Sequence, residues 1–89
     1  MYTPQVATGT ITGTGSAITV NIGFKPNYVL IVNKTQSTRL EYTGSKTNKL
    51  TTTPTFAFND NITVLENGFT LAAAENSASD AIEYVAIGV

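Results

Sequence analysis

The sequence predicts a small all-β domain, either a β-sandwich or a Greek-key barrel of about 7–8 short antiparallel strands with an extended N-terminal arm. Thr occurs 16 times among the 89 residues and only 12% of the residues are charged, and a chain rich in β-branched and aromatic residues favours strands over helices. Short runs that alternate apolar and polar residues are separated by Gly, Asn and Pro, which is typical of half-buried strands joined by turns. The Asn67-Gly68 dipeptide between two such runs predicts a hairpin.

The most apolar run, residues 28–33, is expected to lie at the centre of a sheet. Its alternation places Tyr28, Leu30 and Val32 on one face, and the intervening apolar side chains on the other. A strand that is apolar on both faces must be covered on both faces. We expect the domain's own second sheet to cover one face and a neighbouring subunit to cover the other.

The remaining elements follow from the same alternation and from turn residues. A turn at residues 23–26 leads into the central strand, and a helical turn is expected to follow residue 72. Other strands are expected at residues 6–12, 17–22, 38–43, 56–58, 62–65, 69–72 and 81–89, with a long loop at residues 44–55. The side chains expected to be largely buried are Phe24, Leu30, Val32, Leu40, Tyr42, Val64, Phe69 and Tyr84.

The chain is expected to consist of an N-terminal arm or edge strand, residues 1–12, and a single β-sandwich domain, residues 13–89. Residues 1–24 carry no charged side chain. A Thr-rich and charge-free segment is suited to adding a strand to the sheet edge of a partner. We therefore expect Val6 and Ile11 to contact a sister subunit or another protein.

The residue types of the chain argue against catalysis and against a bound metal or cofactor. The sequence has no Cys and no His, so disulfides, thiolate and imidazole ligands, and the most common catalytic base are missing. Its six carboxylates are scattered over turns and polar strand faces rather than paired. The Ser45-Lys46 pair is interpreted as solvated loop rather than as a catalytic serine–lysine dyad, and Asn59-Asp60-Asn61 as an Asx-type turn rather than as a calcium site. A domain of this size without a disulfide or a metal gains stability by oligomerising, so we predict no enzyme and no cofactor, but a homo-oligomer.

Charge and hydropathy exclude two classes of partner. The net charge is −1, which provides no basic field for nucleic acid. No apolar run approaches the roughly 20 residues that cross a bilayer, and no signal peptide is recognisable. We expect a soluble protein made in the cytoplasm, with no nucleic-acid or membrane partner.

Charge is unevenly distributed along the chain. All basic residues lie between residues 25 and 49, which carry a net charge of +4, whereas the carboxylates that follow give −5. In a monomer these segments pair between neighbouring loops, and in a ring the basic segment of one subunit faces the acidic segment of the next. Both arrangements are open at this stage, and the basic candidates for subunit or capsid contacts are Lys25, Lys34, Arg39, Lys46 and Lys49.

Several segments resemble the small all-β structural proteins of tailed bacteriophages. The resemblance covers roughly residues 9–89, and similar segments occur both in capsid decoration, or cement, proteins and in β modules of tail fibres. The segments that carry it are Gly15-Ser16-Ala17-Ile18-Thr19-Val20, Gly23-Phe24-x-Pro26-x-Tyr28-Val29-x-Ile31-x-Asn33, Asn67-Gly68-Phe69-Thr70 and Ile82-Glu83-Tyr84-Val85-Ala86.

This resemblance implies a virion protein without catalytic residues or cofactors. We expect a homotrimer that binds the major capsid protein on the outer surface of the shell and stabilises it. Two alternatives remain: a β module of a phage tail or tail fibre that serves adhesion, and a carbohydrate-binding β-sandwich. The lack of Trp disfavours the carbohydrate-binding class, in which exposed aromatic rings are expected.

Overall fold

The computed structural model describes residues 5–50 and 56–88, and these form a sandwich of two antiparallel sheets. The all-β prediction is confirmed. Because the two sheets do not close into one barrel, the sandwich is the alternative that holds. The elements are β1 (Gln5–Thr12), β2 (Ile18–Asn21), β3 (Tyr28–Asn33), β4 (Thr38–Tyr42), β5 (Thr47–Leu50), β6 (Phe56–Asn59), β7 (Ile62–Leu65), β8 (Gly68–Leu71), the 3-10 helix η1 (Ala73–Glu75) and β9 (Ala81–Gly88).

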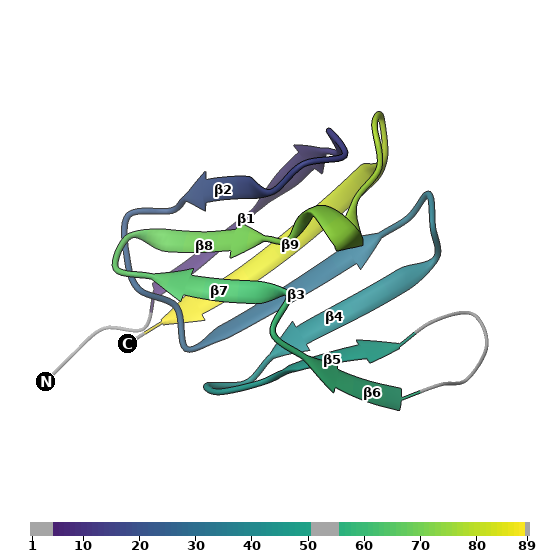
Figure 1. Ribbon diagram of the computed structural model, residues 1–89. Coiled ribbons are helices and arrows are strands. Elements are labelled where there is room, and N and C mark those ends of the chain that lie inside the picture. The colour runs from purple at the N-terminus through teal and green to yellow at the C-terminus, as the bar shows by residue number, and fades with distance from the viewer. Residues whose placement is uncertain (1–4, 51–55, 89) are drawn as a thin grey trace, which may run out of the picture.

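The larger sheet has the strand order β1-β9-β3-β4-β5-β6, and the smaller sheet has the order β2-β8-β7. Figure 1 shows the smaller sheet lying across one face of the larger one, while β5 and β6 extend beyond it. The central position expected for residues 28–33 is confirmed, because β3 pairs with β9 on one side and with β4 on the other. The expected hairpin joins β7 to β8, and the expected helical turn is η1.

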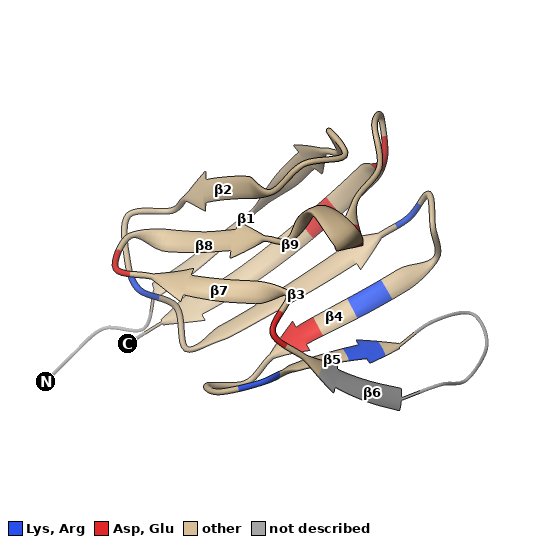
Figure 2. Ribbon diagram, in the orientation of Figure 1, with Lys and Arg blue, Asp and Glu red and all other residues tan. Residues whose placement is uncertain are grey.

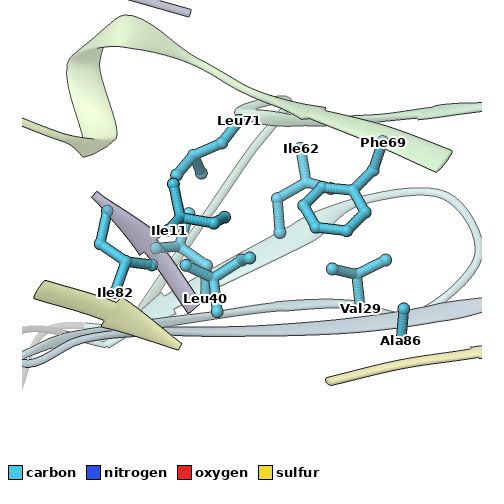
Figure 3. Packing of buried hydrophobic residues seen from close by; sticks show 9 residues of the cluster. Ile11, Val29, Leu40, Ile62, Phe69, Leu71, Ile82 and Ala86 are labelled. Atoms are coloured by element: carbon cyan, nitrogen blue, oxygen red, sulfur yellow. The ribbon is translucent and has the colours of Figure 1, made fainter. Parts of the chain in front are cut away.

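The core lies between the two sheets. Phe69 and Leu71 of β8 and Ile62 of β7 point from the smaller sheet toward the larger one (Figure 3). Burying side chains of this size stabilises the fold by about 1.5–3 kcal/mol each. The larger sheet contributes Ile11, Val29, Ile31, Leu40, Ile82 and Ala86.

The prediction that Leu30 and Val32 are core residues is wrong. Val29 and Ile31 are fully buried, whereas Leu30 and Val32 point to the opposite face and are only partly buried. Asn33 is in phase with the buried pair and is itself fully buried. Its amide donates hydrogen bonds to Asp80 Oδ2, at 2.9 Å, and to the backbone carbonyl of Glu75, at 3.3 Å.

The other expected core residues divide into two groups. Leu40 and Phe69 are fully buried, as predicted. The rings of Phe69 and Tyr84 meet edge to face with centroids 5.5 Å apart, the geometry that aromatic pairs prefer. The side chains that are only partly buried are Phe24, Tyr42, Val64 and Tyr84.

The prediction of a loop across residues 44–55 is correct for residues 44–46, which lie between strands, but wrong for residues 47–50, which form β5. This strand pairs with β4 in a register that runs from Tyr42↔Thr47 to Arg39↔Leu50. Its inward-facing side chains are Thr47 and Lys49, so the apolar alternation that marks other strands is missing. Residues 51–55 of the expected loop lie outside the described residues.

Gly9 in β1 makes room for an aromatic ring. It lies directly opposite Tyr84 of β9, and a Cβ atom at Gly9 would lie 2.7 Å from the Tyr84 hydroxyl oxygen. The aromatic ring therefore covers the glycine, an arrangement that compensates for the missing side chain in a sheet. This glycine permits close packing of β1 on β9.

A buried amide ties the turn before β2 to η1. The Asn76 Oδ1 atom accepts hydrogen bonds from the backbone N–H groups of Thr14 and Gly15, at 2.8 and 2.9 Å. The Asn76 Nδ2 atom donates to the carbonyls of Ser16 and Ala72, at 3.0 and 3.2 Å. Because buried polar groups are costly when unpaired, this satisfied amide fixes the position of the turn.

Candidate interface surfaces

The face of the larger sheet that points away from the smaller sheet is called the open face. On β1 and β9 it carries two strongly exposed apolar side chains, Val6 at 63% and Ile87 at 38% exposure. Leu50 on β5 is 46% exposed. Among the residues whose side chains the structure describes, the apolar and aromatic ones on the open face are Val6, Tyr28, Leu30, Val32, Leu50, Val85 and Ile87.

These side chains are contiguous across strands. Val6 on β1 pairs with Ile87 on β9, which in turn pairs with Tyr28 on β3. The next row contains the directly paired residues Val85 and Leu30. Directly paired side chains of an antiparallel sheet have Cβ atoms about 4.5–5.5 Å apart, so the apolar surface is continuous over three strands.

Shallow hollows separate the rows of side chains on the open face. One of about 310 Å³ lies between β1 and β9 near Thr8 and Val85, and one of about 150 Å³ borders Leu30 and Val32. A third, of about 170 Å³, lies between β4 and β5 beside Leu50. Side chains of an opposing surface could interdigitate with these rows.

Tyr28 lies at the boundary between the apolar rows and the charged side chains of β4. Its hydroxyl donates a hydrogen bond of 2.7 Å to Glu41 Oε2. Burial, followed by this contact with the Glu41 carboxylate, raises the pKa of the Tyr28 hydroxyl. The phenol is therefore neutral at physiological pH and acts as a hydrogen-bond donor.

The opposite outer surface of the sandwich has different chemistry, and we call it the threonine face. It is the solvent side of β2, β8 and β7, where a Thr19–Thr70 hydroxyl pair is hydrogen-bonded at 3.0 Å. A hollow of about 230 Å³ lies over Gly68, between Asn21 and Leu65. The side chains of this face are Thr19, Asn21, Thr63, Leu65 and Thr70.

Each basic residue makes an ion pair within its own chain. The two closest pairs are Lys49 Nζ–Glu75 Oε1 at 2.7 Å and Lys34 Nζ–Glu83 Oε2 at 2.8 Å. The remaining pairs are Lys25–Glu66 at 3.8 Å, Arg39–Glu41 at 3.8 Å and Lys46–Asp60 at 3.0 Å. Figure 2 shows that β1, β2, β7 and β8 carry no charged side chains.

The segregation of charge along the sequence is thus resolved into contacts between neighbouring segments of one chain. Four of the five pairs have side chains that are mostly half-exposed or more, and such pairs contribute about 0–1 kcal/mol each. The Lys49–Glu75 pair differs, because the Glu75 side chain is 2% exposed and that of Lys49 is 27% exposed. Asn61 also donates a hydrogen bond to this carboxylate.

The seven residues predicted to form contacts do not gather on one surface. Val6 and Arg39 belong to the open face, and Lys34 forms an ion pair with Glu83, whose side chain lies on that face. Ile11 lies in the core, and Lys49 points inward to Glu75. Lys25 and Lys46 lie in the turns before β3 and before β5.

The residues considered for catalysis or calcium binding make structural contacts. The Lys46 ammonium donates to both carboxylate oxygens of Asp60, at 3.0 and 3.1 Å. The Asx-type turn is confirmed, because Asn59 Oδ1 accepts from the backbone N–H of Asn61 at 3.0 Å. Among residues 5–50 and 56–88, no group of three or more carboxylates is placed to hold a metal ion. No helix in these ranges is long and apolar enough to span a membrane.

Asp80 is the most strongly hydrogen-bonded carboxylate of the sandwich. Its Oδ2 atom accepts from Asn33 Nδ2, Gln36 Nε2 and the backbone N–H of Ser77, at 2.9, 2.7 and 2.8 Å. The hydrogen bond from Asn33, followed by that from Ser77, lowers the pKa of the Asp80 carboxyl. The donors join β3, the following turn and the segment before β9, so this carboxylate has a structural role.

Most of the open face was not predicted from the sequence as a contact surface. Val6 and Arg39 were expected to form contacts, but Leu30, Val85 and Ile87 were not. The available signal was the apolar character of both faces of residues 28–33, which predicted an external cover without identifying the face that needs it. No family model, curated protein or solved structure matches this chain.

Proposed function

We propose that this protein is a virion structural protein of a tailed bacteriophage, a capsid decoration protein that forms a homotrimer and binds the outer surface of the shell. The observation that carries the proposal is the open face. A domain of 89 residues that leaves continuous apolar sheet surface in solvent is typical of an assembly component, because exposed apolar patches mark interaction sites. Small domains without a disulfide or a metal also gain stability by association.

The sequence resemblance to phage structural proteins supports the choice of assembly. Its segments correspond to β2 and the turn before it, the turn and strand of β3, the β7–β8 hairpin and the middle of β9. These are the elements that build the sandwich, so the resemblance concerns a shared scaffold. The charged side chains of Lys46, Asp80 and Lys49 make contacts within the chain, which favours a mechanical function over a catalytic one.

The proposed mechanism is stabilisation by linkage. A protein that binds only the assembled shell stabilises that shell by mass action. A trimer repeats the same binding surface three times about its axis, which suits the local three-fold positions of an icosahedral lattice. The protein is made in the host cytoplasm and then joins the major capsid protein on the virion.

The test is to add purified protein to expanded capsids from a phage that lacks its gene. We expect stoichiometric co-sedimentation and a higher temperature of capsid rupture. An unrelated protein of similar size at the same concentration is the control. Capsids that neither bind the protein nor gain resistance contradict the proposal, and recovery of the protein with tails instead favours the tail or tail-fibre alternative.

A further inference from the structure

We infer that the open face is the surface through which copies of this chain contact one another, arranged about an axis that runs along β3. This inference rests on the homo-oligomer of the proposed function, but it does not require a capsid. It assigns Ile87, Val85 and Leu30 to the subunit interface. The threonine face remains outside that interface.

The size of the open face is sufficient for association. The strands β1, β9, β3, β4 and β5 contain 31 residues, and each residue occupies about 3.4 Å along the strand and about 4.8 Å across it, so this part of the face covers roughly 500 Å². Two such faces contribute about 1,000 Å², the area that a specific interface is expected to reach. Its centre is apolar and its charged side chains, on β4 and near the start of β9, border that centre, and a depletion of charge at the centre is characteristic of interface cores.

The charge of the open face favours another copy of the same chain over a strongly charged partner. Lys34 and Arg39 on this face are matched by Glu41 and Glu83, so its net charge is zero. A neutral face provides no attraction for nucleic acid or for an acidic or basic protein. Two copies of a neutral face approach without net repulsion.

One cross-strand row specifies the arrangement. Val32 pairs with Glu83 of β9 on one side and with Arg39 of β4 on the other. In a ring whose axis runs along β3, the β9 side of one sheet approaches the β4 side of the next at the same height along the axis. Glu83 of one copy then lies near the Arg39 side chain of its neighbour, while the apolar rows face the axis.

The first experiment compares two matched substitutions, Ile87→Glu and Leu65→Glu. The wild-type residues have nearly equal exposure, 38% and 39%, but Ile87 belongs to the open face and Leu65 to the threonine face. Light scattering and sedimentation measure molar mass over a range of concentrations, and circular dichroism verifies folding. We expect Ile87→Glu to weaken association by about 100-fold, because it buries an unpaired carboxylate, and Leu65→Glu to retain wild-type association.

Val6→Glu is the second open-face variant. Val6 is 63% exposed, so a charge is tolerated at this position in the isolated chain. We expect Val6→Glu to weaken association while the circular dichroism spectrum stays unchanged. A wild-type protein that is monomeric at tens of micromolar overturns the inference, as do open-face variants that associate like the wild type or a Leu65→Glu variant that dissociates equally.

A charge exchange tests the arrangement about β3. Glu83→Arg and Arg39→Glu are made singly and together. Each single variant places like charges across the interface, and we expect weaker association, whereas the double variant restores opposite charges and recovers it. Recovery supports contact between these two positions of neighbouring copies, and a double variant that associates no better than the single variants overturns the arrangement.

Binding to capsids is measured separately on the same proteins. If the wild-type protein forms an oligomer that Ile87→Glu dissociates, but the wild-type protein does not bind capsids, the decoration function is contradicted and the interface assignment remains intact. A monomer that binds capsids contradicts the interface assignment and leaves the decoration function intact. The two proposals therefore fail in distinguishable ways.

Discussion

The two outer faces of this sandwich are built from the same kind of short alternating strand, yet they present different surfaces to solvent. The threonine face carries hydroxyl and amide groups, with Leu65 as its apolar exception. The open face has a continuous apolar centre, in which Val6, Ile87 and Tyr28 form one cross-strand row. The smaller sheet therefore has to be covered only on its inner face, where the core lies, whereas the larger sheet also has an apolar outer face that requires a cover.

This difference shows that whether a sheet must be covered on one face or on both depends on the residue pattern of each of its strands. In β2 the alternation is apolar inward and polar outward, the usual pattern for a sheet with one face in water. In β3 both alternating sets are apolar, and only the set containing Val29 and Ile31 is covered by the smaller sheet. The uncovered set is the basis for proposing an assembly.

The largest effect on the free energy of unfolding is expected when two adjacent residues that point to opposite faces of β3 are compared. Ile31→Ala removes a fully buried side chain and is expected to lower the free energy of unfolding by about 3–4 kcal/mol. Leu30→Ala, on the open face, is expected to cost about 1 kcal/mol when the protein is dilute and monomeric. Urea denaturation measures both.

The dependence of these two unfolding penalties on protein concentration further distinguishes the two faces of β3. At concentrations where copies associate, the Leu30→Ala penalty is expected to grow, because association stabilises the folded state, and the Ile31→Ala penalty is expected to remain large throughout. Equal penalties for the two variants at every concentration would show that the two sides of β3 do not differ in burial.

The next effect concerns the contact that joins the larger sheet to η1. Lys49→Met leaves the buried Glu75 carboxylate without its ammonium partner and is expected to destabilise the fold by about 3 kcal/mol. The matched control is Lys46→Met, whose exposed pair with Asp60 contributes about 0–1 kcal/mol. Thermal unfolding that affects both variants alike would contradict the special role of Lys49.

A pH-dependent effect is expected from Asp80. Its pKa is lowered in the folded protein, so the unfolded chain binds the proton more tightly, and the resulting stabilisation is complete above the unfolded pKa of about 3.9. This stabilisation is lost as the pH falls through the lower, folded pKa. Asp80→Asn is therefore expected to lower the melting temperature at neutral pH and to flatten its decline in acid.

The matched control for this measurement is Asp60→Asn, which removes an exposed ion pair with Lys46. We expect it to leave the neutral-pH melting temperature nearly unchanged. An Asp80→Asn protein with the wild-type acid profile would contradict the assigned role of the Asn33, Gln36 and Ser77 hydrogen bonds.

The smallest effect on folding is expected on the threonine face. Thr19→Val and Thr70→Val remove a solvent-exposed hydroxyl pair, and each is expected to change the free energy of unfolding by no more than about 0.5 kcal/mol. The double variant makes this face resemble the open face, so we expect additional self-association in sedimentation. A molar mass equal to that of the wild type at all concentrations would show that apolar character alone does not make a sheet face associate.

Local pattern in the sequence determined the strand content, the central position of β3 and the β7–β8 hairpin. These features depend on neighbouring residues: the alternation of side chains, β-branched composition and the Asn67-Gly68 turn. The need for a second cover on the larger sheet also follows from the two apolar sets of β3. None of these inferences requires knowledge of which strands are paired.

Tertiary structure decided which apolar set of β3 lies in the core, that residues 47–50 form β5, and which carboxylate each basic residue meets. An alternating pattern with a period of two identifies two faces but not which one is inward, and that choice depends on where β8 packs and on the inward partners of Asn33. The inward residues of β5, Thr47 and Lys49, carry no apolar signal, because Lys49 points toward a carboxylate distant in sequence. Such long-range contacts form only when the whole chain folds, so the open face could be recognised as a surface only in three dimensions.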